Sequence, residues 1–89
     1  MNKEDLRAIL VEERFKPRAY SLDPEFRDEA LCLRFEDEKW CVFYSERGLE
    51  TGKQCFADEG SACEYFLGRM RADPTRKIDY KSGFVMPRR

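Results

Sequence analysis

The sequence predicts an α+β fold: a two-layer sandwich in which an antiparallel meander sheet of three to four strands carries N- and C-terminal helices on one face. Three observations support it. Residues 31–44 hold two runs in which apolar and polar side chains alternate with period two, as in half-buried strands. Residues 3–15 and 59–72 instead carry apolar residues at helical spacing. Consecutive strands with short links pair antiparallel, and their apolar face must be covered by the helices.

Length and charge indicate one domain with a separate tail. The chain has 89 residues, enough for a single modest core. Residues 1–74 carry 12 Lys and Arg against 17 Asp and Glu and are expected to form the α+β domain. Residues 75–89 carry 5 basic residues against 1 acidic residue and are expected to be a basic tail, partly ordered at most. The acidic body argues against nucleic acid as a partner.

No apolar run approaches the roughly 18 residues that a membrane helix needs, so we expect no membrane partner. The first 15 residues are too acidic and too helical in pattern for a signal peptide. Both observations favour a cytoplasmic location.

The first helix is predicted over residues 3–15. Asn2 is a favourable N-cap, and acidic residues in the first turn suit the helix dipole. Pro17 is expected to end the helix, because the residue before a proline avoids the helical conformation. A short extended segment at 18–22 follows, and Asp23-Pro24 is a turn signal.

The central feature is a hairpin with arms at 30–36 and 39–45. Placing Phe35 opposite Trp40 aligns six apolar residues on one face, and a slip of one residue would expose them. These six, with Trp40 as a core residue, are Leu31, Leu33, Phe35, Trp40, Val42 and Tyr44. The opposite face, with Arg34, Glu36, Lys39 and Phe43, is expected to be the wetter one. The turn lacks the Asn-Gly or Asp-Gly of preferred two-residue turns, so its position is better defined than its type.

A further strand is predicted over 49–56, interrupted at Gly52 by a bulge or a turn. The last helix is predicted over 59–72, capped by Asp58 and ended by Asp73-Pro74. Its core-facing stripe consists of Ala62, Cys63, Phe66, Leu67 and Met70.

The four cysteines lack the paired spacing of a zinc site, and the chain has no histidine. In the hairpin register above, Cys41 lies opposite Arg34 and Cys32 opposite Phe43, so these two cysteines do not pair. We expect all four to be thiols that pack as small apolar residues, with a disulfide or a metal as the alternative. No metal and no cofactor are predicted.

Two groups of charged residues are candidate partner-binding sites. Glu36, Asp37 and Glu38 form an acidic patch or a merely solvated turn at the hairpin tip. Glu46 and Arg47 form a functional or a structural ion pair at a strand exit beside a glycine. The acids lack an apolar pocket that could shift a pKa, so no catalytic residue is predicted.

Two motifs resemble those of small bacterial immunity proteins of polymorphic toxin systems. Residues 40–48 fit a W-x-V-x-Y-x-E-R-G strand and loop, and residues 56–67 fit an F-x-x-E-x-x-A-C-x-Y-F-L helix. The resemblance spans about residues 6–73 and excludes the basic tail. It implies a non-catalytic protein that binds and neutralises a cognate toxin in the cytoplasm of the producing cell, and it does not identify the toxin.

Two other classes of function stay open. One is a generic protein-interaction or oligomerising domain, including a homodimer. The other is a small enzyme or a nucleic-acid binder, for which the sequence offers least support.

Overall fold

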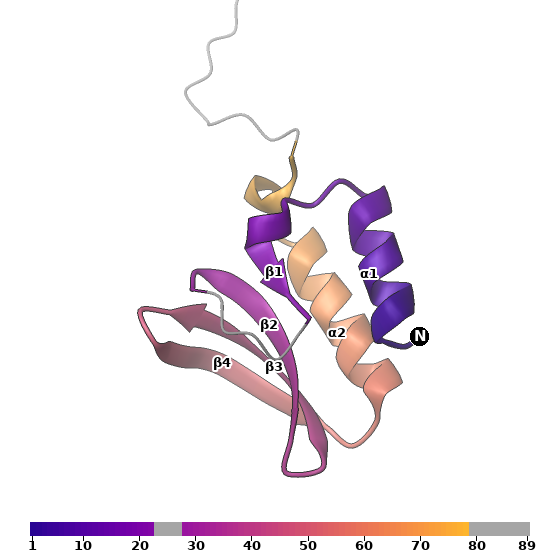
Figure 1. Cartoon of the computed structure of the whole chain (residues 1–89), viewed down its shortest axis with the longest axis vertical. Helices are drawn as coiled ribbons and strands as arrows, with labels where there is room; N and C mark the ends of the chain where they lie inside the picture. The colour runs from indigo at the N-terminus through magenta and orange to yellow at the C-terminus, as the bar shows by residue number, and fades with distance from the viewer. Residues whose placement is uncertain (23–27, 79–89) are drawn as a thin grey trace, which may run out of the picture.

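The computed structural model describes residues 1–22 and 28–78 and has an α+β fold with four strands and two α-helices in the described part. Both helices lie on the same side of the sheet (Figure 1). The sheet is mixed and open, with its strands in the order β1-β2-β3-β4. The elements are α1 Lys3–Glu12, the 3₁₀ helix η1 Pro17–Ala19, β1 Tyr20–Ser21, β2 Ala30–Glu36, β3 Lys39–Glu46, β4 Leu49–Phe56, α2 Glu59–Arg71 and the 3₁₀ helix η2 Pro74–Arg76.

The predicted hairpin is confirmed together with its register. Strands β2 and β3 pair antiparallel, with Phe35 opposite Trp40 and Leu33 opposite Val42. Cys41 lies opposite Arg34, so it does not meet Cys32 across the hairpin, as expected. The alternation of apolar residues was therefore enough to fix the pairing.

The core lies between the sheet and the helices. It contains side chains from α1, β2, β3 and α2, namely Leu6, Leu10, Leu31, Leu33, Val42, Ala62, Cys63, Phe66, Leu67 and Met70, joined by Phe15, Tyr20 and Leu22. Helix α2 contacts β2, β3 and β4, and α1 packs against α2. The helices run in the same direction, because the Lys3 N–H donates to Glu59 at one end while Glu13 pairs with Arg71 at the other.

Two predictions for the hairpin's aromatic residues need correction. Trp40 is only partly buried, although it packs against the core, and Phe35 is 55% exposed. The hairpin tip projects beyond the ends of both helices (Figure 1), so no helix covers Phe35. Phe43, expected on the wetter face, is 0% exposed and packs with Ala30 and Cys32 in a second small core.

The expectation of a fully antiparallel sheet is wrong for β1. This strand pairs with β2 in parallel, with Tyr20 opposite Leu31 and Ser21 opposite Cys32. Parallel neighbours usually need a long connection. Because β1 has only two residues, the chain has to run back only a short distance before it enters β2 in the same direction.

Helix α1 ends earlier than predicted, at Glu12 and not at residue 15. Arg14 adopts a left-handed conformation, with φ 64°. The Phe15 N–H then donates to the Leu10 carbonyl at 3.0 Å and the Arg14 N–H to the Val11 carbonyl at 3.0 Å. These two bonds form a Schellman motif, which usually carries glycine where this chain has Arg14.

Strand β4 contains the predicted irregularity. Its pairing with β3 shifts register between Val42 and Tyr44, and Gly52 has φ 61°, which defines a β-bulge. On the C-terminal side of the bulge in β4, Cys55 lies opposite Cys41 of β3, and the two form a disulfide. The prediction of four thiols is therefore wrong for this pair, while Cys32 and Cys63 are not disulfide-bonded.

Helix α2 confirms its prediction to within one residue, with Asp58 as its N-cap. Residues 75–78, the start of the expected basic tail, contact the body: the Ile78 N–H donates to the Arg14 carbonyl at 2.6 Å. Residues 79–89 and the Asp23-Pro24 turn signal lie outside the described residues. In the described ranges, no helix combines the length and apolar character needed to cross a membrane.

The two phenylalanines of the hairpin give a matched test of this packing. We expect Phe43→Ala to lower the free energy of unfolding by about 3–5 kcal/mol, the range for a large aromatic residue removed from a core. Phe35→Ala, at the exposed position, should lower it by no more than about 1 kcal/mol. Urea denaturation of both variants measures the difference, and equal losses would show that the second core does not form.

Candidate functional site

The five residues predicted to contact a partner lie at opposite ends of β3. Glu36 ends β2 and is followed by Asp37 and Glu38 in the β2–β3 turn, whereas Glu46 ends β3 and is followed by Arg47 in the β3–β4 turn. Strand β3 has eight residues, so at about 3.3 Å per residue the two turns are roughly 23 Å apart. The five residues therefore form two separate candidate surfaces.

The β2–β3 tip holds two acidic residues in an unusual backbone conformation. Asp37 and Glu38 are exposed, with φ values of 51° and 62°. A two-residue turn of this kind needs positive φ at both positions, which Asn-Gly adopts easily and most other residues do not. Aspartate, like asparagine, accepts this conformation at the first position, whereas Glu38 stands where glycine is usual and is disfavoured by about 1–2 kcal/mol. The tip therefore keeps the Glu38 carboxylate at a position where the backbone would favour glycine.

An exposed aromatic side chain lies beside these acids. The Phe35 ring packs against the Trp40 ring in a tilted arrangement, with the two ring centroids 4.8 Å apart. Trp40 in turn lies opposite Phe56 on β4, and Phe56 contacts Tyr65 of α2 at 5.3 Å. A partly exposed aromatic row thus crosses the sheet next to the acidic tip. Sequence reasoning missed Phe35 because it assigned this residue to the core.

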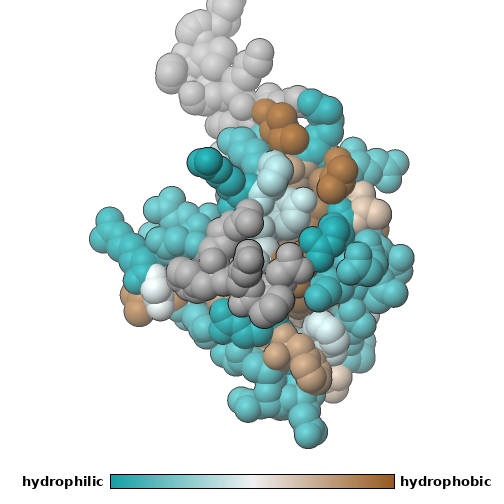
Figure 2. Space-filling view, in the orientation of Figure 1, coloured by the Kyte–Doolittle hydropathy of each residue, from teal (hydrophilic) through white to brown (hydrophobic). Residues whose placement is uncertain are grey.

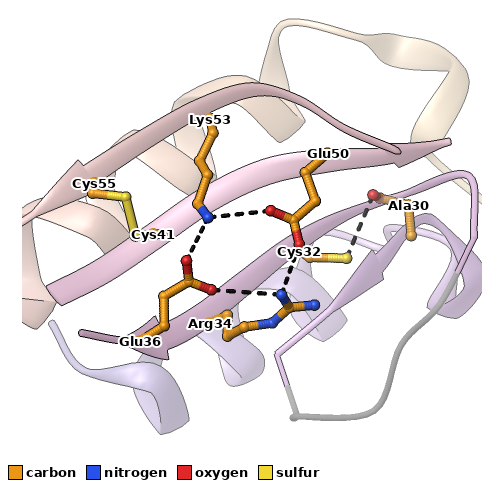
Figure 3. Close-up of polar contacts among 8 residues, drawn as sticks. All are labelled: Ala30, Cys32, Arg34, Glu36, Cys41, Glu50, Lys53 and Cys55. Atoms are coloured by element: carbon orange, nitrogen blue, oxygen red, sulfur yellow. Dashed lines mark hydrogen bonds and ion pairs between the residues drawn. A yellow bond between two sulfur atoms is a disulfide. The ribbon is translucent and has the colours of Figure 1, made fainter. Parts of the chain in front are cut away.

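Glu36 belongs to a different environment from its two neighbours. It forms an ion-paired ring with Arg34, Glu50 and Lys53 on the face of the sheet that the helices leave uncovered (Figure 3). Arg34 Nη1 lies 2.8 Å from Glu50 and 3.5 Å from Glu36, and Lys53 Nζ lies 3.1 Å from Glu50 and also contacts Glu36. The Glu36 carboxylate is therefore already paired with two cations.

This charged ring covers the second core. The Arg34 guanidinium lies 4.6 Å from the centroid of the Phe43 ring, and Lys53 Nζ lies 5.8 Å from it. The stems and charges of these two residues shield an aromatic ring that would otherwise face water. The bulge at Gly52 makes the ion-paired ring of the four charged residues possible. It brings Glu50 and Lys53, three residues apart, to the same face of β4.

The ion pairs shift the protonation of two members of the ring. Hydrogen bonds from Lys53 and then Arg34 lower the pKa of Glu50 below its ordinary value. Hydrogen bonds to Glu36 and then Glu50 raise the pKa of Lys53. Both groups therefore hold their charges more firmly than isolated side chains would.

The second candidate surface is organised by its backbone. Arg47 and Gly48 have φ 54° and 82°, so this turn also has two positive φ values, and Gly48 confirms its expected role. The Arg47 N–H donates to the Asp28 carboxylate at 2.6 Å, which ties the turn to the segment before β2. Glu46 is exposed. These contacts favour a structural role for the Arg47 backbone and leave both side chains on the surface.

The surface of the described part has hollows near both ends of the sheet. One, of about 250 Å³, lies between η1, η2 and Tyr44. The other, of about 400 Å³, lies at the β2–β3 end of the sheet and is lined by Glu36, Asp37, Lys39, Cys41, Lys53 and Cys55. No cluster of three or more Cys, Asp or Glu side chains in the described ranges has the arrangement of a metal site.

The visible face of the molecule is mostly hydrophilic, with apolar side chains in small separate groups (Figure 2). The chain matches no protein-family model, no curated protein and no solved structure. The resemblance to immunity proteins therefore rests on the sequence motifs alone.

The strained tip can be tested by giving it the residues that its backbone favours. We expect Asp37→Asn combined with Glu38→Gly to raise the free energy of unfolding by about 0.5–1 kcal/mol, because both residues accept positive φ. Urea denaturation measures the gain. Glu38→Gln, which removes charge but keeps the side chain's backbone preference, is the control and should give no gain. An equal gain in the control would assign the effect to charge repulsion.

The ion-paired ring should make stability depend on pH in a defined direction. Because the pKa of Glu50 is lowered in the folded chain, its contribution is present above its unfolded pKa and is lost as pH falls through its folded pKa. Glu50→Gln should therefore be less stable than wild type at neutral pH, by at most about 1 kcal/mol for these partly exposed pairs, and equal to it in strong acid. The matched control, Glu38→Gln, should have the stability of wild type at both pH values. If Glu50→Gln were less stable than wild type by the same amount at neutral pH and in strong acid, the loss would not come from the ion pairs of Glu50.

Proposed function

We propose that this chain is a non-catalytic immunity protein that binds a cognate bacterial toxin and neutralises it by stoichiometric protein–protein interaction. The family part of the proposal is supported by the two motifs at residues 40–48 and 56–67. The first motif contributes β3 and the turn after it, and the second contributes the end of β4 and most of α2. In this proposal the fold is a two-layer sandwich that acts as a rigid support for a binding surface, and the protein acts in the cytoplasm.

The observation that best supports a binding role is the composition of the β2–β3 tip. Asp37 and Glu38 are exposed and have no ion pair in the described part of the chain, and Glu38 holds an unfavourable backbone conformation close to the exposed Phe35. Unfavourable local conformations are retained at functional sites more often than elsewhere. An aromatic side chain with charged residues around it is also the usual composition of an interface hot spot.

The charge of the tip indicates the partner's surface. Two unpaired carboxylates attract a basic surface, speed its encounter and discriminate against acidic partners. Toxins that act on nucleic acids present basic clefts for their substrates, so a toxin of this kind fits the tip. Phe35 would then enter an apolar depression beside the cleft, and Asp37 and Glu38 would face its cationic rim.

A generic interaction or oligomerising domain is the second candidate, and the position of β4 favours it. Strand β4 is the last strand of the sheet, and almost all its residues are exposed. Such an edge can pair with a strand of another chain, including a second copy in a homodimer. The bulge at Gly52 and the charged Lys53 both oppose this pairing, and for that reason we place it second.

The toxin proposal is tested by co-expression with a toxin-like protein encoded beside this chain. We expect the chain to protect the cells. We also expect to recover a complex in which the chain and the toxin are present in a 1:1 ratio. Asp37→Lys combined with Glu38→Lys should weaken the complex at least about tenfold and reverse the salt dependence of its affinity. Phe35→Ala should weaken it by a comparable factor with little change in salt dependence.

Glu46→Lys, at the other end of β3, is the matched control for a change of charge, and it should leave the affinity nearly unchanged. Equal killing with and without the chain, with no complex recovered, would refute the immunity function. Protection that survives the changes at Phe35, Asp37 and Glu38 but is lost in Glu46→Lys would keep the function and move the interface to the β3–β4 turn.

A further inference from the structure

The Cys41–Cys55 disulfide borders the surface hollow at the β2–β3 end of the sheet. It joins β3 to β4 on the face of the sheet that the helices leave uncovered (Figure 3). The two half-cystines differ in access: Cys41 is 1% exposed, whereas Cys55 lies on the exposed edge strand. Both line the hollow of about 400 Å³. A small molecule in this hollow would therefore reach Cys55 far more easily than Cys41.

The rest of the hollow carries charges of both signs. Lys39 and Lys53 supply ammonium groups, and Glu36 and Asp37 supply carboxylates. Lys53 and Glu36 pair with each other, which leaves Lys39 and Asp37 without an ion pair in the described part. A peptide thiol such as glutathione carries carboxylates and an ammonium group as well as its sulfur. Its charges can therefore be matched while its sulfur lies near the disulfide.

We propose that the Cys41–Cys55 disulfide is a thiol-exchange site for a small zwitterionic peptide thiol, which enters the hollow and attacks Cys55 Sγ. In the first step the thiolate forms a new S–S bond with Cys55 Sγ, and the Cys41–Cys55 bond breaks. The electron pair of the broken bond remains on Cys41 Sγ, which takes a proton from water. A second thiol attacks the mixed disulfide and releases the Cys55 thiol and the oxidised dimer of the small thiol, so two thiols are oxidised for each protein disulfide reduced.

The other two cysteines provide an internal contrast. Burial raises the pKa of the Cys63 thiol to about 11, so almost none of it is thiolate near neutral pH. Cys32 is buried in the second core, where its Sγ donates to the Ala30 carbonyl at 3.6 Å. Exchange should therefore be confined to the Cys41–Cys55 pair while the chain is folded.

The site does not depend on the proposed immunity function, although it has a consequence for the neighbouring tip. Asp37 belongs both to the hollow and to the β2–β3 turn. A mixed disulfide at Cys55 would place a charged peptide next to this carboxylate. Reduction of the bond would also remove the covalent link between β3 and the edge strand β4.

The test uses the full oxidised chain and reduced glutathione, with acid quenching and peptide mapping without reductant. In wild type we expect the transient glutathione adduct on Cys55 and not on Cys41. With glutathione disulfide as the probe, Cys41→Ser should form an adduct at Cys55 at least about tenfold faster than Cys55→Ser forms one at Cys41. Lys39→Gln should slow the reaction of glutathione by a larger factor than that of 2-mercaptoethanol, whose thiolate is its only charge.

Circular dichroism is the control for the folding of each variant. The map of glutathione adducts on the wild-type chain tests the proposal without any variant. Three results would overturn it. The first is a disulfide that resists glutathione until the chain is denatured, and the second is equal adduct formation at Cys41 and Cys55. The third is a chain that contains four thiols and forms no Cys41–Cys55 bond when treated with glutathione disulfide.

Discussion

The structure depends on the central position of β3, which requires cover on both faces of the sheet. Val42 and Phe43 are consecutive residues that point to opposite faces, and each is 0% exposed. The helices cover Val42, together with the apolar residues of β2. Phe43 has no helix above it and is shielded by Arg34 and Lys53. The charged ring is therefore the counterpart, on the second face, of the helical layer on the first.

The same constraint explains the irregularity of β4. With a regular period of two, Glu50 and Lys53 would point to opposite faces of the sheet. The bulge at Gly52 removes this conflict, so both side chains lie near Phe43 and complete the ring with Arg34 and Glu36. The bulge also disrupts the exposed edge of the sheet, which opposes strand addition there. One residue with positive φ thus serves packing on one face and protects an edge.

The sequence was sufficient to predict an element where apolar residues recur with a regular period on a buried face. Alternation fixed the β2–β3 register, and helical spacing fixed α2, because a shift of either would have exposed several apolar side chains. It was insufficient where a single residue decided the backbone. The end of α1 depends on a left-handed Arg14, and arginine gives no signal for that conformation, unlike glycine.

The disulfide was missed for a related reason. The position of Cys41 was compared only with β2, where it faces Arg34. Had Trp40 been placed opposite Phe56, the two cysteines would have fallen opposite each other on β3 and β4. The charges of the candidate site were easy to find in the sequence, but their grouping was not. Only the structure separates the paired Glu36 from Asp37 and Glu38, and the tip from the β3–β4 turn.

These features together assign different tasks to the two ends of the β2–β3 hairpin. Toward its base, side chains are buried and the strands contact β1, β4 and α2. At its tip, the hairpin extends beyond the helices and carries the exposed Phe35 ring, two carboxylates without an ion pair among the described residues, and a nearby disulfide. A partner can contact this tip without disturbing the core, because the residues it would touch contribute little to packing. The body can therefore tolerate substitutions at the tip, and under the proposed function such substitutions would change the partner without loss of the fold.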